Sequence, residues 1–131
     1  MTNETELLSR MEYKHIVYAL ILIKKELYFF DRNALAYGLQ KAADVYPHFK
    51  KTFAQDGLAG IIADMQNEKF LQDWSHRTDS YFITEYGKFQ IDKQLKRYGT
   101  DVVETLNPLA EIVWANAKKY RHSTHFVRRR E

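Results

Sequence analysis

The stretch from Asp56 to Leu95 constrains the fold of this chain more than any other. It begins with apolar residues at helical spacing and continues as FLQDW, then a polar run SHRTD, then SYFITEYGKFQIDKQL. Apolar positions that recur every three or four residues predict a helix, whereas short runs rich in aromatic and β-branched residues predict strands. The stretch therefore predicts a helix, two strands joined by a tight turn, and a second helix, in that order.

Length and composition favour one folded domain. A chain of 131 residues can bury one continuous core, whereas two cores would each be small. Its apolar share of 45% and charged share of 28% are ordinary for a folded protein and too apolar for a disordered one. We expect a single domain over residues 1–120, including a C-terminal amphipathic helix, and a basic tail over residues 121–131.

Cysteine usage and the N-terminus bear on the compartment. The absence of cysteine excludes disulfides and Cys-ligated zinc, and it fits a reducing environment. The opening MTNETELLSR is polar and acidic, unlike a secretory signal, so we expect a cytoplasmic protein. The longest apolar run, Ile16–Ile23, has eight residues, far fewer than the roughly 20 that cross a bilayer. We expect no membrane partner.

Three helices are predicted before the strands. The first spans Thr5 to about Phe30, the second starts near Asn33 and ends before Pro47, and the third covers about Leu58 to Glu68. In the first helix the apolar residues alternate in steps of four and three along one face: Ile16, Leu20, Ile23, Leu27 and Phe30.

The strands are predicted at Lys69–Trp74 and Ser80–Ile83, separated by the polar run Ser75–Asp79. Thr84 can cap the next helix, which runs to Leu95 and on towards a stop at Gly99.

The last segment begins at Thr100 or Asp101, where Asp101 and Glu104 have the spacing of a capping box. Asn107 and Pro108 either cap a new helix or kink this one. The apolar positions of the segment keep the four-three alternation of a coiled-coil seam. We expect them to form a homodimer interface, and the alternative is that they pack back on Ile16, Leu20 and Ile23. The positions assigned to the interface are Val102, Leu106, Leu109, Val113 and Tyr120.

From about Leu58 to Leu95 the chain resembles the second half of a winged helix-turn-helix in transcription regulators of the MarR and PadR kinds. The residues that carry the resemblance are Ile83, Thr84, Glu85 and Gly87, where the second strand of the wing runs into the following helix. The resemblance implies a mainly α fold with a small β-hairpin, a winged helix-turn-helix flanked by N- and C-terminal helices. It also implies a homodimeric DNA-binding transcription regulator that inserts its third helix into the major groove of a palindromic site.

Under that resemblance, candidate contacts to double-stranded DNA lie in four places. They lie before the third helix, at its end, in the wing and in the basic tail, where amides, hydroxyls and cationic side chains suit base edges and phosphates. The candidates are Lys50, Lys51, Thr52, Gln55, Gln66, Asn67, Lys69, Ser75, His76, Arg77, Thr78, Arg128, Arg129 and Arg130.

Charge around the third helix opposes this assignment. Asp56, Asp64 and Glu68 lie on it with no Lys or Arg between them, and phosphates repel carboxylates. A winged-helix-like protein-interaction module, an inhibitor or adaptor without DNA binding, is therefore the alternative. Large aromatics could anchor such a partner or fill the core. They are Tyr13, Tyr18, Tyr28, Phe29, Trp74, Tyr81 and Trp114.

No catalytic motif is present. Glycine-rich phosphate loops and nucleophile elbows are absent, and among the five histidines only His122 and His125 have a spacing that could share a metal on one helical face. We expect no enzyme activity, no cofactor and no metal.

Overall fold

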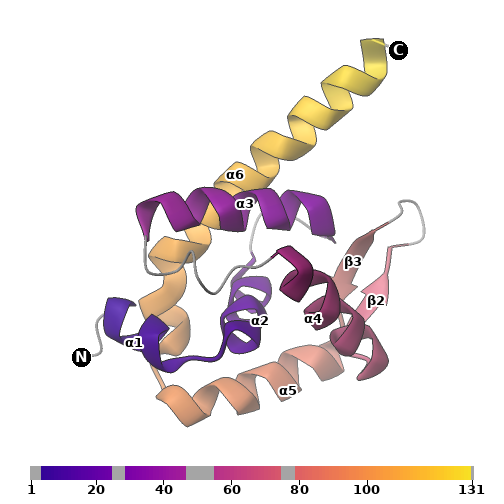
Figure 1. Cartoon of the computed structure of the whole chain (residues 1–131). Helices are drawn as coiled ribbons and strands as arrows, with labels where there is room; N and C mark the ends of the chain where they lie inside the picture. The colour runs from indigo at the N-terminus through magenta and orange to yellow at the C-terminus, as the bar shows by residue number, and fades with distance from the viewer. Residues whose placement is uncertain (1–3, 25–28, 47–54, 75–78, 131) are drawn as a thin grey trace.

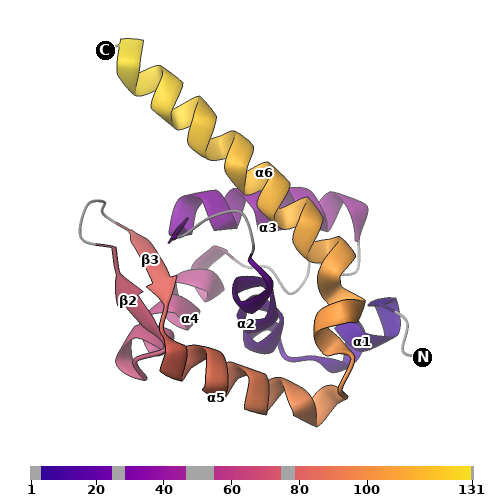
Figure 2. The ribbon, with the colours of Figure 1, turned by 180° about the vertical axis from the view of Figure 1, so that it is seen from behind.

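The computed structural model of this chain (Figures 1 and 2) describes residues 4–24, 29–46, 55–74 and 79–130, except the side chains of residues 55, 56 and 121–130. The described residues are mainly helical, with one small antiparallel sheet. In chain order the elements are α1 (Glu4–Arg10), α2 (Tyr13–Ile23), β1 (Phe30–Asp31), α3 (Arg32–Val45), α4 (Gln55–Asn67), β2 (Leu71–Asp73), β3 (Ser80–Ile83), α5 (Glu85–Leu95), the 3-10 turn η2 (Lys96–Tyr98) and α6 (Val102–Arg130).

The N-terminal region differs from its prediction of one helix from Thr5 to Phe30. Helix α1 ends where the amide of Met11 donates to the carbonyl of Leu7 (3.2 Å), and Glu12 is extended (φ −69°, ψ 147°) before α2 begins. Leu8 and Met11 stay buried, so the apolar spacing continues through the break and conceals it. Helix α2 then stops at Ile23, and Phe30 belongs to a strand.

Helix α2 is the centre of the core. It is buried almost all round, and Ile16, Val17, Leu20 and Ile21 are at most 1% exposed. Helices α5 and α6 pack against it from different sides (Figure 1). The indole Nε1 of Trp114 in α6 donates to the carbonyl of Leu20 at 2.8 Å, so a buried polar atom is satisfied across the core.

Helix α3 packs closely on α6. Asp31 caps α3 by accepting from the amide of Ala34 (3.0 Å), and the helix ends at Val45, before Pro47 as predicted. At Gly38 a Cβ atom would lie 2.2 Å from the carbonyl oxygen of Val113. Only glycine fits here, because the α6 backbone occupies the space of a side chain.

The sheet contains the two predicted strands and one that was not predicted. Its order is β1-β3-β2, all antiparallel, with Leu71 opposite Ile83 and Phe30 opposite Tyr81. Strand β1 has only two residues. It was not predicted because its pairing with Tyr81 is non-local. The helical spacing of apolar residues also continues as far as Phe30, so the first helix was predicted to end there.

Helix α6 runs without interruption from Val102 to Arg130, with Pro108 inside it. No second helix starts at Asn107, and the helix crosses the predicted tail boundary at residue 120 without a break. Its C-terminal end projects beyond α3 and away from the rest of the molecule in both views (Figures 1 and 2).

The assignment of the α6 stripe to a dimer interface is wrong for most of its members. Val102, Leu106, Leu109 and Val113 are between 0% and 2% exposed within the single chain. They belong to the same core as Ile16, Leu20 and Ile23, which is the alternative left open above. Only Tyr120 keeps part of its surface, so the buried stripe has nothing to offer a second copy.

Candidate nucleic-acid interface

Helix α4 presents an outward face made of small and polar residues. Leu58, Ile62 and Met65 are buried and fix the helix on the core. The exposed residues on the other side are Ala59, Gly60, Ala63, Asp64 and Asn67. Because a Cβ at Gly60 would meet nothing within 4 Å, the backbone of this helix is open to a partner.

The end of α4 is tied to the first strand by a tight left-handed turn. Lys69 has φ 67°, its amide donates to the carbonyl of Gln66 (3.0 Å), and the amide of Phe70 donates to that of Met65 (2.8 Å). These two bonds form a Schellman motif, which normally carries glycine at the left-handed position. The turn sends the chain from α4 directly into β2.

Thr84 and Gly87 hold this turn against α5. The hydroxyl of Thr84 donates to the carbonyl of Lys69 (2.8 Å) and accepts from the amide of Gly87 (2.9 Å), which confirms the predicted cap. A Cβ at Gly87 would lie 2.4 Å from the carbonyl oxygen of Phe70. Two of the residues that carried the family resemblance therefore have a defined packing role.

The base of the β2–β3 hairpin is fixed to the start of α3. The amide of Arg32 donates to the carbonyl of Asp79 (2.8 Å), and its guanidinium lies 3.4 Å from the Asp79 carboxylate. Burial, together with the charge of Asp79, raises the pKa of the neighbouring Tyr81 hydroxyl. Arg32 was not among the predicted site residues, and no motif in the sequence distinguishes it.

An aromatic cluster joins the same hairpin to the residue before β1. The rings of Phe29 and Trp74 stack at 4.9 Å with an interplanar angle of 5°, and Phe82 meets Trp74 edge-on at 6.4 Å. All three side chains are half-buried. Trp74 and Phe29 were predicted as partner anchors or core, and the structure stacks their rings on each other.

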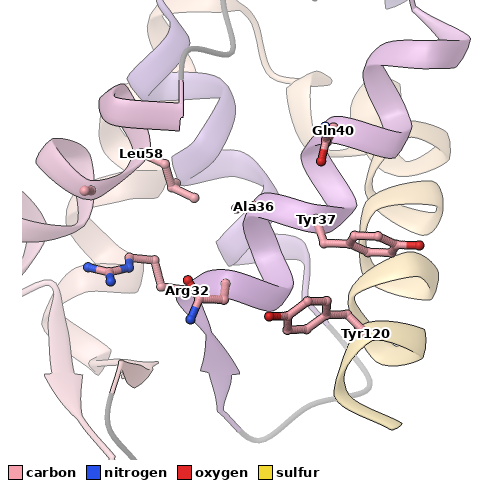
Figure 3. A pocket seen from close by; sticks show the side chains of 8 residues that line it. Arg32, Ala36, Tyr37, Gln40, Leu58 and Tyr120 are labelled. Atoms are coloured by element: carbon pink, nitrogen blue, oxygen red, sulfur yellow. The ribbon is translucent and has the colours of Figure 1, made fainter. Parts of the chain in front are cut away.

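A shallow groove of about 400 Å³ lies beside α4 (Figure 3). Arg32, Ala36 and Gln40 line it from α3, Leu58 from α4, and Tyr120 from α6. The rings of Tyr37 and Tyr120 lie 5.5 Å apart at one end, so Tyr120 contacts α3 of its own chain.

The structure brings together three of the predicted DNA contacts. Gln66, Asn67 and Lys69 lie at the end of α4, where Asn67 and Lys69 are exposed. Gln66 is half-buried, and its Nε2 donates to the Asp73 carboxylate on β2 at 2.6 Å, so its amide is already engaged.

The other predicted contacts cannot be placed as side chains. Lys50, Lys51 and Thr52, and Ser75, His76, Arg77 and Thr78 of the predicted turn, lie outside the described residues. Gln55 starts α4, and Arg128, Arg129 and Arg130 end α6, as backbone positions only.

Within the described residues, no cluster of histidine and acidic side chains could hold a metal ion, and no helix is both long and apolar enough to cross a membrane. No protein-family model, curated protein or solved structure gives a match to this chain.

Proposed function

We propose that this chain is a winged-helix DNA-binding transcription regulator. It would place α4 in the major groove and the β2–β3 hairpin against the sugar-phosphate backbone of the DNA. The observation that carries the proposal is the order of elements. A helix, a short strand, two helices and a hairpin follow one another from α2 to β3, and the strands join in the order β1-β3-β2. In winged-helix proteins this order leaves the last helix before the hairpin free to read DNA.

The outward face of α4 supports close approach to a duplex. Ala59, Gly60 and Ala63 present almost no side-chain bulk, and Asn67 adds an amide at the end of the same face. The Schellman turn and the Thr84 hydrogen bonds hold α4 and the hairpin together, so the two elements would meet DNA in a preformed arrangement.

Positive charge would come from the flanks of α4. Lys69 follows the helix directly and is exposed. Lys50, Lys51 and Arg77 of the sequence, and the Arg128–Arg130 run, are the proposed phosphate contacts, since cationic side chains supply most sequence-independent affinity.

A homodimer remains part of the proposal, through a different surface from the one first expected. The α6 stripe up to Val113 is buried, but the end of α6 beyond Tyr120 projects from the body (Figure 2). An isolated helical segment of about ten residues is marginal in water, so packing against a second copy would stabilise it.

The second candidate is a protein-interaction module of the same architecture. The observation that favours it is the charge of α4, which carries Asp56 and Asp64, is followed directly by Glu68 and contains no Lys or Arg from Gln55 to Asn67. A surface of this kind repels phosphates and would suit a protein partner that occupies the same face.

Fluorescence anisotropy with a labelled random-sequence duplex separates the two. A regulator binds in the micromolar range or tighter at low salt, and log K falls linearly as log salt rises. Replacing Arg77 and the Arg128–Arg130 run by alanine should weaken binding uniformly across sequences and flatten that slope. Negligible binding at low salt would reject DNA binding and leave the interaction module.

A further inference from the structure

The outward face of α5 carries an exposed aromatic pair. Tyr86 is 56% exposed and Phe89 is 65% exposed, one helical turn apart. Among the described residues the other exposed large apolar side chains are Val45 and Val103. Since Gly87, Ile91 and Leu95 bury the opposite side of α5, the pair is directed away from the core.

Basic residues continue this face along the helix. Lys93 lies one turn beyond Phe89, and Arg97 follows in η2. We call Tyr86, Phe89, Lys93 and Arg97 the α5 stripe. The ring of Tyr86 is held beside the buried Phe70 at 6.0 Å, so one anchor of the stripe already has a defined position.

The two acidic residues of α5 form ion pairs with lysines close by in the sequence. Glu85 lies 3.6 Å from Lys88, and Asp92 lies 3.4 Å from Lys96. Within the described part of the chain, no carboxylate pairs with Lys93, and the guanidinium of Arg97 lies over the ring of Tyr98 at 5.5 Å. The α5 stripe therefore combines exposed apolar surface with uncompensated positive charge.

We propose that the α5 stripe is a docking surface for an acidic amphipathic helix of another protein. Apolar side chains of that helix would cover Tyr86 and Phe89, and its carboxylates would face Lys93 and Arg97. A second copy of this chain fits less well, because a two-fold contact centred on the stripe brings each lysine towards its symmetry mate.

The N-terminal end of the stripe lies close to the proposed nucleic-acid interface, because the ring of Tyr86 contacts Phe70, which follows Lys69 directly. Helix α5 lies on the opposite side of the molecule from α3 and from the projecting end of α6 in both views (Figures 1 and 2). A partner could therefore dock on the stripe while the projecting end of α6 is engaged.

The test uses two synthetic helical peptides of about 15 residues with the same leucine stripe, one carrying glutamates and the other lysines at the remaining positions. Each is titrated into the full chain labelled with ¹⁵N. The acidic peptide should shift the amide signals of Tyr86, Phe89 and Lys93, and the basic peptide should not. Phe89→Ser and Lys93→Glu should each weaken binding by about tenfold, whereas Lys41→Glu, at an exposed position of α3, should leave it unchanged.

Several outcomes overturn the proposal. They are no binding, equal binding of both peptides, or shifts located outside α5. Shifts at the stripe that grow with protein concentration alone would identify a second copy as the occupant. Displacement of the acidic peptide by a single-stranded oligonucleotide at the same residues would assign the stripe to nucleic acid.

Discussion

The hydroxyl of Thr84 donates to the carbonyl oxygen of Lys69 at 2.8 Å, across a separation of 15 residues. The hydroxyl oxygen of Thr84 also caps α5, because it accepts a hydrogen bond from the amide of Gly87. One side chain thus fixes the end of α4, the return of the hairpin and the start of α5. The proposed DNA-reading helix is oriented by a residue that need not touch DNA.

Replacing Thr84 with valine tests this role. The variant keeps the shape of the side chain and loses both hydrogen bonds, so the free energy of unfolding should fall by about 1–2 kcal/mol. Urea denaturation followed by circular dichroism measures the change. Thr100→Val, at an exposed position, is the matched control and should have little effect. Equal stability of the two variants would contradict the role of Thr84.

Two glycines should respond oppositely to the same substitution. Gly38→Ala places a methyl group 2.2 Å from the Val113 carbonyl, so α3 and α6 must separate, at a cost of about 1–3 kcal/mol or more. Gly60→Ala adds a methyl in open space on α4 and should stabilise the helix by about 0.5–1 kcal/mol. Thermal melts of the two variants should move in opposite directions, and a common direction would refute the close α3–α6 contact.

Two substitutions of Lys69 distinguish its effect on stability from its effect on DNA binding. Its backbone is left-handed, so Lys69→Gly should relieve strain and raise stability by about 1 kcal/mol. If the side chain contacts phosphate, the same variant should reduce the salt slope of DNA binding by about 1. Lys69→Ala is the control, because it should reduce the slope equally without a gain in stability. A Lys69→Gly protein that is no more stable would count against the left-handed turn.

Stability should depend on the protonation of His15. The ring is 1% exposed, its Nδ1 lies 2.7 Å from the Tyr98 hydroxyl, and Tyr18 meets it edge-on. Burial, opposed by the charge of Glu12, lowers the pKa of His15 below its ordinary value of 6.5. A folded-state pKa below the unfolded one contributes stability above pH 6.5, and that contribution is lost as the pH falls through the folded value.

The measurement is urea unfolding of the native chain and of His15→Gln between about pH 8 and pH 5. The native chain should lose stability towards the acid end more steeply than the variant. Parallel curves would show that His15 does not titrate with the fold. Lys14 and Arg97 disfavour the protonated ring, whereas Glu12 favours it, so removing Glu12 should move the transition to lower pH.

If α4 reads DNA, its composition favours A·T pairs. Arginine and lysine, the usual readers of guanine, are absent from it, whereas exposed Ala59 and Ala63 suit thymine methyl groups and Asn67 suits adenine. Selection from a random duplex pool should enrich A·T-rich half-sites, and Asn67→Ala should lose about 1–3 kcal/mol of discrimination at one position. Enrichment of G·C-rich sites would oppose insertion of this face.

Local patterns predicted the segment from α4 to α5 well. The strands at Leu71–Asp73 and Ser80–Ile83 and the Thr84 cap follow from residue types and short-range spacing, which act within a few residues. The third strand depends on Phe30 pairing with Tyr81, and no local pattern encodes that contact.

The α6 stripe shows a different limit of sequence reasoning. Its spacing correctly predicted one apolar face, but an apolar face does not specify what covers it. The structure buries Leu106 and Val113 in this chain's own core. Gln66 shows the same limit in the candidate site. The side-chain amide of Gln66 was expected to read bases, but after the turn at Lys69 the Asp73 carboxylate lies close enough to accept its hydrogen bond.

Helix α2 is apolar on nearly every side and is covered by segments made much later in the chain; its contact from Leu20 to Trp114 spans 94 residues. During synthesis, this helix therefore leaves the ribosome long before its cover exists. Until α6 emerges, the apolar surface of α2 stays exposed in the growing chain. Aggregation competes most strongly with folding during this interval. Premature termination before Trp114 should yield a species that depends on chaperones or is degraded, rather than a smaller working protein.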